Sequence, residues 1–211
     1  MKIKKLGHCC FIAEINGKRI MTDPGSFSTL QNEEKNIDAV VITHEHQDHL
    51  HMDSMKEILK NNPNVVVITN TAVGKLLTEA GIAFTKVEDG ETHDFSGVAI
   101  SGFGNIHAEI YGDMGRVQNT GFMIGDLCFP GDAFELPNKK VDILALPIAG
   151  PWLKIKESID YAKSVKPRIC FGVHDAVLSN AASFVWQLSA GILEKDTIAF
   201  KQLEIGKEEE I

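Results

Sequence analysis

The feature that most constrains the fold is a run of four apolar residues, 39–42, followed directly by a polar segment, residues 43–51, that is rich in histidine and acid. A short apolar run bounded by polar residues predicts a strand that is buried on both faces, as in a sheet covered by other layers. The polar segment then leaves the sheet at the carboxyl end of this strand, where loops carry functional side chains. The sequence therefore predicts a layered protein with ionisable groups gathered at one sheet edge.

The rest of the chain alternates between strand-like and helix-like segments. Asn16-Gly17 separates the strand-like runs 9–15 and 18–22, and this dipeptide is typical of a two-residue hairpin turn. A last strand is expected at 198–205, and helices are expected at residues 53–60, 71–80, 155–165 and 177–188. Strands with helices spaced between them predict an α+β protein whose sheets are covered by helices.

No linker rich in Pro, Gly or Ser divides the chain, so we expect one domain over residues 1–206. The acidic end, residues 207–211, is expected to be a short solvated tail. The four cysteines show no C-x-x-C spacing and are expected to be reduced thiols packed as small apolar groups.

Composition narrows the class of partner. The formal net charge is −8 and the pI is about 5.5, which disfavours nucleic acid because an acidic surface repels phosphate backbones. A small-molecule substrate is expected instead. No apolar run approaches the ~20 residues that span a bilayer, and no apolar core follows the basic residues 1–5. We therefore expect a cytoplasmic protein without a membrane partner, and a homo-oligomer is left open.

The segment after the buried strand has the residue types of a metal site. His44, His46 and His49 are imidazoles, and Asp48 adds a carboxylate; such ligands suit zinc first, and manganese or iron as alternatives. In an extended chain His44 and His46 share one side, and the following turn can bring Asp48 and His49 around a second point. Since four such ligands crowd a single ion, the spacing favours two. A solvated loop explains one histidine, but not this density.

The pattern His44-x-His46-x-Asp48-His49 resembles the signature of the metallo-β-lactamase-fold hydrolases. That resemblance implies a four-layer αββα sandwich, and the remaining motifs of the family can be matched in order to about residue 174. The matched residues are an early aspartate that orients ligands, a downstream histidine, a bridging aspartate that ends a strand, and a last histidine after a buried strand: Asp23, His107, Asp132 and His174.

By this resemblance two divalent metal ions are expected, most simply Zn²⁺, with Mn²⁺ or Fe as alternatives. The first would be bound by His44, His46 and His107, the second by Asp48, His49 and His174, with Asp132 between them. Asp23 and His8 would support these ligands from behind, although for His8 a packed strand histidine is an equal alternative. His51 and His93 are interpreted as surface residues.

Within the superfamily, residues 7–11 and the compact length most resemble the small L-ascorbate-6-phosphate-lactonase-like branch. Relatives in that branch commonly carry proline two residues before the last histidine, whereas this chain has Gly172. That departure leaves the loop geometry at His174 open.

The resemblance implies a hydrolase in which a hydroxide shared by two ions attacks an ester, lactone or phosphoester bond of a small molecule. Asp48 is expected to be a ligand that also accepts the proton of the nucleophile. Residues 112–118, 134–139 and 151–153 are expected walls of the substrate site, and Trp152 would either stack on a substrate ring or pack in the core.

No G-x-S-x-G elbow supports serine chemistry. Two alternatives remain, namely a noncatalytic metal-binding or regulatory protein of the same fold and a diiron oxidoreductase.

Overall fold

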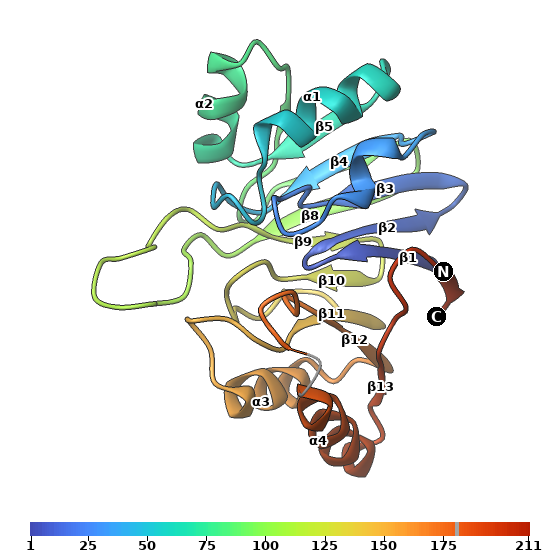
Figure 1. Cartoon of the computed structure of the whole chain (residues 1–211), viewed down its shortest axis with the longest axis vertical. Helices are drawn as coiled ribbons and strands as arrows, with labels where there is room; N and C mark the ends of the chain where they lie inside the picture. Colours follow the sequence, from blue (N-terminus) through green and yellow to red (C-terminus); the bar gives the residue numbers. More distant parts are fainter. Residues whose placement is uncertain (180–181) are drawn as a thin grey trace.

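The computed structural model describes residues 1–179 and 182–211. Within these ranges the strands form two seven-stranded sheets that lie face to face, with helices on both outer surfaces (Figure 1). The four layers confirm the predicted α+β sandwich of αββα type. None of the helices in the described ranges is long and apolar enough to cross a membrane.

The first sheet has the strand order β14-β1-β2-β3-β4-β5-β6. Its strands are β1 Lys2–Gly7, β2 Cys10–Ile15, β3 Lys18–Thr22, β4 Ala39–Ile42, β5 Val66–Thr69, β6 Thr85–Lys86 and β14 Glu208–Glu210. The predicted hairpin between β2 and β3 is confirmed, because Asn16 and Gly17 have φ values of 51° and 73°. Positive φ at both central positions is the conformation that a two-residue hairpin turn needs.

The second sheet has the order β13-β12-β11-β10-β9-β8-β7. Its strands are β7 Thr92–Phe95, β8 Val98–Phe103, β9 Gly121–Ile124, β10 Leu127–Phe129, β11 Ile143–Pro147, β12 Ile169–Val173 and β13 Ala199–Lys201. The two sheets meet in an apolar interior, in which the Phe11 ring lies 5.3 Å from Phe129 and 5.1 Å from Phe171, edge to face. Such contacts hold the sheets in register with one another.

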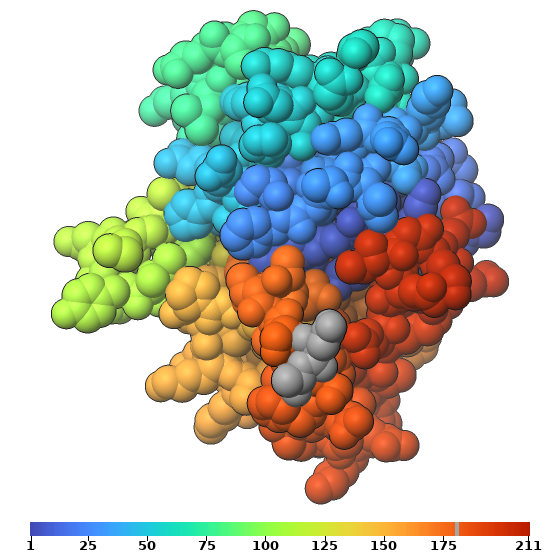
Figure 2. All heavy atoms as spheres, in the orientation of Figure 1, coloured from blue at the N-terminus to red at the C-terminus, as the bar shows by residue number. Residues whose placement is uncertain are grey.

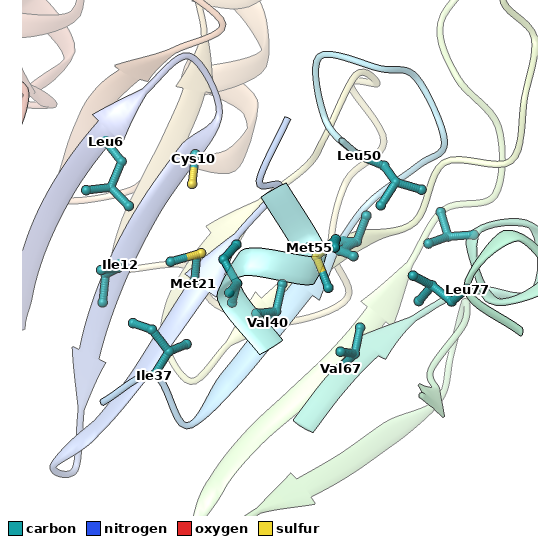
Figure 3. Packing of buried hydrophobic residues seen from close by; sticks show 13 residues of the cluster. Leu6, Cys10, Ile12, Met21, Ile37, Val40, Leu50, Met55, Val67 and Leu77 are labelled. Carbon is teal, nitrogen blue, oxygen red and sulfur yellow. The ribbon is translucent and has the colours of Figure 1, made fainter. Parts of the chain in front are cut away.

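Helices α1 Met52–Asn61 and α2 Thr71–Glu79 cover the outer face of the first sheet. Figure 3 shows their apolar side chains, among them Met55 and Leu77, packed on strand residues such as Val40 and Val67. Helices α3 Ile155–Val165 and α4 Ser183–Leu193 cover the second sheet in the same way. A short 3₁₀ helix, η1 Leu30–Glu33, lies beside α1, and a second, η3 Glu194–Asp196, follows α4. Every layer therefore buries an apolar face, which fixes the strand ends that carry the site.

Two predictions for the C-terminal region are wrong. The helix predicted at 177–188 begins only at Ser183 and continues to Leu193; residues 180–181 of that prediction lie outside the described residues. The strand predicted at 198–205 is confined to Ala199–Lys201. The cause is that α4 carries apolar residues on nearly every side, so its sequence gave little indication of its ends.

The acidic end is largely exposed, as expected, but it forms a strand instead of a tail. Residues Glu208–Glu210 form β14, which pairs antiparallel with β1 at the edge of the first sheet. Lys2 stands opposite Glu210, and Lys4 stands opposite Glu208; the Lys2 ammonium also lies 3.1 Å from the Glu208 carboxylate. Opposite charges on paired strands stabilise the pairing, which explains why a run of three glutamates becomes a strand here.

Candidate metal centre

The seven predicted ligands come together at one edge of the sandwich, at the carboxyl ends of several strands. His44, His46 and His107 form one group, in which each side chain offers a ligand atom within 4.8 Å of the others. His44 Nε2 lies 3.2 Å from His46 Nδ1, and the rings of His46 and His107 lie 4.6 Å apart. Three imidazoles at this spacing surround a volume that suits one cation.

A second group lies beside the first. Asp48, His49 and His174 meet within the same 4.8 Å limit, and His8 is the fourth member. Asp48 Oδ2 lies 3.7 Å from both His49 Nε2 and His174 Nε2. A carboxylate and two imidazoles facing one point are again a ligand set for a borderline cation.

Asp132 joins the two groups. Its Oδ2 lies 3.3 Å from His107 Nε2 in the first group and 3.0 Å from His174 Nε2 in the second, and its Oδ1 lies 3.3 Å from His49 Nε2. One buried carboxylate thus faces both ligand sets at once. His44 and His174, which are 130 positions apart in sequence, belong to a single centre.

Separate loops place these side chains. His44, His46, Asp48 and His49 follow β4 in one continuous segment, whereas His107 lies in the long loop after β8. This loop, which we call the arm (residues 104–120), projects from the molecule beside the site (Figure 1). Asp132 and His174 follow β10 and β12, respectively. Because β10, β11 and β12 are parallel, their carboxyl ends reach the same edge.

Hydrogen bonds behind the ligands fix which ring nitrogens face inward. Asp23 Oδ2 accepts from His49 Nδ1 at 2.6 Å and from Thr43 Oγ1 at 2.6 Å. Because the Thr43 hydroxyl hydrogen is used in the bond to Asp23, Thr43 Oγ1 can only accept from His44 Nδ1, 3.0 Å away. His107 Nδ1 donates to the carbonyl of Ala108 at 2.6 Å. In each of these histidines Nδ1 is held from behind and Nε2 faces the centre as the ligand atom.

The inward-facing atoms have no partner within the described part of the chain. His49 Nε2, His107 Nε2, His174 Nε2 and Asp132 Oδ1 are all buried and make no hydrogen bond. Leaving a buried polar atom unsatisfied costs about 1–3 kcal/mol. Four such atoms in one place would therefore destabilise the folded protein strongly if nothing bound between them. Two divalent cations would satisfy all of them, and the donor set fits such ions.

The electrostatics agree with a cation site. Burial lowers the pKa of His44 well below its usual value, so this ring is neutral and ready to bind. Burial alone would raise the pKa of Asp132, but the adjacent His49 and His174 hold it well below its usual range. For His49 burial would lower the pKa, and the carboxylates of Asp132 and Asp23 raise it well above normal instead. A cation bound there would take the place of the His49 proton.

His8 supports the second group. The backbone N–H of Ala176 donates to His8 Nδ1 at 3.3 Å, so the proton of this neutral ring is on Nε2, which lies 3.2 Å from Asp48 Oδ2. The ring also lies 4.1 Å from that of His174. Positive φ values occur at His8, Asp23 and His174 (49°, 31° and 61°), and such backbone conformations concentrate where side chains must be aimed.

Sequence reasoning missed three supporting residues. Thr43 links Asp23 to His44, as described above. Asn119 Oδ1 accepts from the backbone N–H of Asp132 at 3.0 Å and so fixes the turn that carries this carboxylate. Cys9 Sγ lies within 4.8 Å of ligand atoms of His49 and Asp132, but burial raises the thiol pKa well above normal. Of these, only the position of Thr43 directly before the motif gave a signal.

Three further residues singled out in the sequence, His51, His93 and Trp152, lie in different surroundings. His51 contacts Ser54 at the start of α1 and His93 lies on β7, so neither joins the centre. Trp152 is buried, with its ring about equally far from His107 and His174 (6.0 and 5.9 Å), and its indole N–H has no partner among the described residues. It therefore packs beside the centre instead of stacking in an open site.

Of the expected walls, the arm passes close to His46 at Gly115, and Phe134 packs on Trp152. Residues 135–139 run elsewhere, since Lys139 contacts Ser101. The departure at Gly172 also has a structural reason: a Cβ at this position would lie 2.3 Å from the ring of Trp186. Glycine lets that indole pack directly on β12, and His174 still reaches the centre.

Comparison with known proteins agrees with this geometry. Residues 2–174 match the family described as the Beta-lactamase superfamily domain. Protein Rv0786c of Mycobacterium tuberculosis is 30% identical over 192 residues, which cover 88% of this chain and 89% of that protein. A UPF0173 metal-dependent hydrolase of Thermoplasma acidophilum is 25% identical over 189 residues, which cover 82% of this chain and 83% of that protein.

Among solved structures, Igni18, a metallo hydrolase from the archaeon Ignicoccus hospitalis, is similar with a TM-score of 0.78 at 20% identity, over 100% of this chain and 98% of that one. At that identity the likeness bears on the fold alone. The narrower resemblance to the lactonase-like branch stays a prediction. The family match, which spans both ligand groups, and the αββα architecture together place this chain in the metallo-β-lactamase-fold superfamily, to which it belongs.

Proposed function

We propose that this protein is a metal-dependent hydrolase that uses two divalent ions, most simply Zn²⁺, to cleave an ester, lactone or phosphoester bond of a small molecule. The observation that carries the proposal is Asp132, a buried carboxylate that faces two groups of inward-pointing ligand atoms at once. Relatives named as metal-dependent hydrolases support the reaction class.

His44, His46 and His107 would hold one ion, Asp48, His49 and His174 the other, and Asp132 would lie between them. Ions held by these residues would supply an activated water and would polarise the bond to be hydrolysed.

The protein's own groups orient this chemistry. Asp23, buried and bonded to Thr43 and His49, fixes the ring of His49. His8 fixes Asp48 in the same way. Hydrogen bonding from His8 and the charge of His49 outweigh the effect of burial and lower the pKa of Asp48 to about 2. A carboxylate with so low a pKa is a weak base, which favours a ligand role for Asp48 over the expected role as proton acceptor.

Trp152 supplies a buried donor beside the centre that cannot bind a metal. Its N–H is buried and unpaired within the described residues, and its ring lies near a histidine of each group. An indole nitrogen can only donate, so in a complex it would donate to a substrate oxygen on which negative charge develops. The acidic net charge of −8 favours a small substrate over a polynucleotide.

The test combines metal analysis with turnover. We expect the purified protein to contain two divalent ions per chain and to hydrolyse at least one compound in a panel of esters, lactones and phosphoesters. His46→Ala should abolish turnover, whereas the matched control His93→Ala, a histidine outside the centre, should not change it. Bound metal without turnover of any panel compound would favour the noncatalytic binder. Two irons with redox-dependent visible absorption would favour the oxidoreductase.

A further inference from the structure

A cavity of about 380 Å³ lies next to the metal centre. It is lined by residues from β1, from the loop after β12, from α4 and from the segment after β13. Figure 2 shows the face on which these segments meet: the orange loop and α4 adjoin the red C-terminal segment below the blue N-terminal part. The volume lies within the roughly 300–1,000 Å³ that is usual for small-molecule sites.

One imidazole ring separates the cavity from the centre. His8 lines the cavity, and its Nε2–H donates to Asp48 Oδ2 at 3.2 Å. Phe27 lines the cavity as well, with its ring 5.2 Å from that of His8 in an edge-to-face contact. Asp48 is 23% exposed, so part of the second ligand group is accessible to solvent. A molecule that extended across His8 and Phe27 would contact both the cavity and the metal centre.

The lining combines apolar side chains with neutral polar ones. Phe27, Leu178, Trp186 and Ile205 form the apolar part. Ser179, Ser183 and Gln202 add neutral polar groups.

Asp175 is the one charged side chain among the described residues that line the cavity, and it lies 2.7 Å from the ammonium of Lys5. Lys5 is 1% exposed and gives its charge to that pair and to the carbonyl of Gly172, so no lysine or arginine of the described lining faces the cavity. An anionic group of a ligand that was buried in this cavity would find no positive charge to pair with.

The apolar character continues outside the cavity. Phe27, Phe184 and Ile205 are 51%, 64% and 55% exposed and lie on the segments that form its rim. Trp186 is packed against β12 because Gly172 has no Cβ, and its ring forms an inner wall. Large apolar groups around a concave site are the usual lining for an apolar ligand.

We propose that this cavity binds an uncharged, apolar group of the substrate while the bond to be hydrolysed lies at the metal centre. The inference rests on the proposed hydrolase function, since it assigns the substrate class of the same site. It predicts that substrates with a neutral alkyl or aryl tail are preferred over substrates with an anionic tail of the same length.

The first experiment uses 4-nitrophenyl esters, which share one leaving group. Each methylene that enters the cavity is expected to raise kcat/KM by up to about fourfold, so hexanoate should exceed butyrate by roughly tenfold, and the hemisuccinate should fall below butyrate. Ser183→Phe and Gln202→Phe, both in the lining of the cavity, should raise KM for hexanoate and remove this preference. Gln187→Phe, an exposed position on α4 outside the cavity, is the matched control.

A second measurement does not depend on turnover. The chain has two tryptophans, so Trp152→Phe leaves Trp186 as the only indole and a reporter of the cavity. Neutral 4-nitroanisole should quench its fluorescence saturably, 4-nitrobenzoate should do so at least tenfold more weakly, and adding Ser183→Phe should abolish the quenching.

The outcomes separate the two proposals. Esters cleaved without any tail preference, or quenching that never saturates, would overturn the cavity assignment and leave the hydrolase intact. Saturable, Ser183-dependent quenching in a protein that hydrolyses no panel compound would uphold the apolar site and overturn the proposed function.

Discussion

The two sides of the metal centre are built in different ways. On the side of the first sheet, four of the seven proposed ligands come from one continuous segment, His44–His49, that leaves β4. On the side of the second sheet the other three come from separate loops, after β8, β10 and β12. The first arrangement can be recognised within six residues of sequence, whereas the second exists only when three distant strand ends share one edge.

Their supports differ as well. Behind the continuous side lies Asp23, whose carboxylate takes three hydrogen bonds from Thr43 and His49. Behind the scattered side two of the ligands have separate contacts: His107 donates to a neighbouring carbonyl, and Asn119 fixes the backbone at Asp132. The comparison teaches that a single substitution at Asp23 can alter the geometry of the continuous side. On the scattered side, a substitution of one supporting residue should affect only the ligand that it contacts.

The largest effect should come from removing a ligand on either side. His46→Ala and His174→Ala should each lower kcat/KM by about 10³-fold or more, because a metal ion contributes several kcal/mol to the transition state. Each variant should also lose close to one equivalent of metal, measured by elemental analysis. If one variant kept normal activity, the two sides would not act as a single centre.

A smaller loss is expected at the shared support. Asp23→Asn keeps the shape but removes the charge that orients His49, and changes of this kind typically cost about 10–100-fold in activity or metal affinity. Metal titration and steady-state kinetics measure it. Asp53→Asn, an exposed carboxylate at the start of α1, is the control. Unchanged metal affinity in Asp23→Asn would show that the continuous side holds its geometry without that carboxylate.

Trp152 lies near His107 and His174, one from each ligand group, and tests the region between the two groups. Trp152→Phe should lower kcat about three- to tenfold with full metal content, since one neutral hydrogen bond contributes about 0.5–1.5 kcal/mol. An effect on KM alone would indicate that the indole binds the ground state and the transition state equally.

The smallest effect on activity is expected far from both sides. Deleting residues 208–211 removes β14 from the edge of the first sheet. The melting temperature should drop by a few degrees, because about 1 kcal/mol corresponds to roughly 2–4 °C in a chain of this size. Hydrolysis should stay within about twofold of the full-length protein. A large loss of activity would mean that this edge communicates with the centre.

The sequence by itself determined the local features. The buried strand 39–42, the Asn16-Gly17 turn and the ligand spacing from His44 to His49 depend on interactions between near neighbours, so their meaning is visible without the fold. Helix α3 was predicted with its observed bounds because its apolar stripe has a clear period. His107, Asp132 and His174 were identified through the resemblance, not through spacing.

Only the tertiary structure decided what depends on distant partners. The pairing of the acidic end with β1 required two segments about 200 positions apart, and no local pattern distinguishes such a strand from a tail. The tautomers of the histidines follow from contacts with Asp23, Thr43 and Ala108. The reason for Gly172 became visible only with Trp186 against it. Packing and hydrogen bonding act through space, so a pattern read along the chain can indicate which residue types are present but not which of them meet.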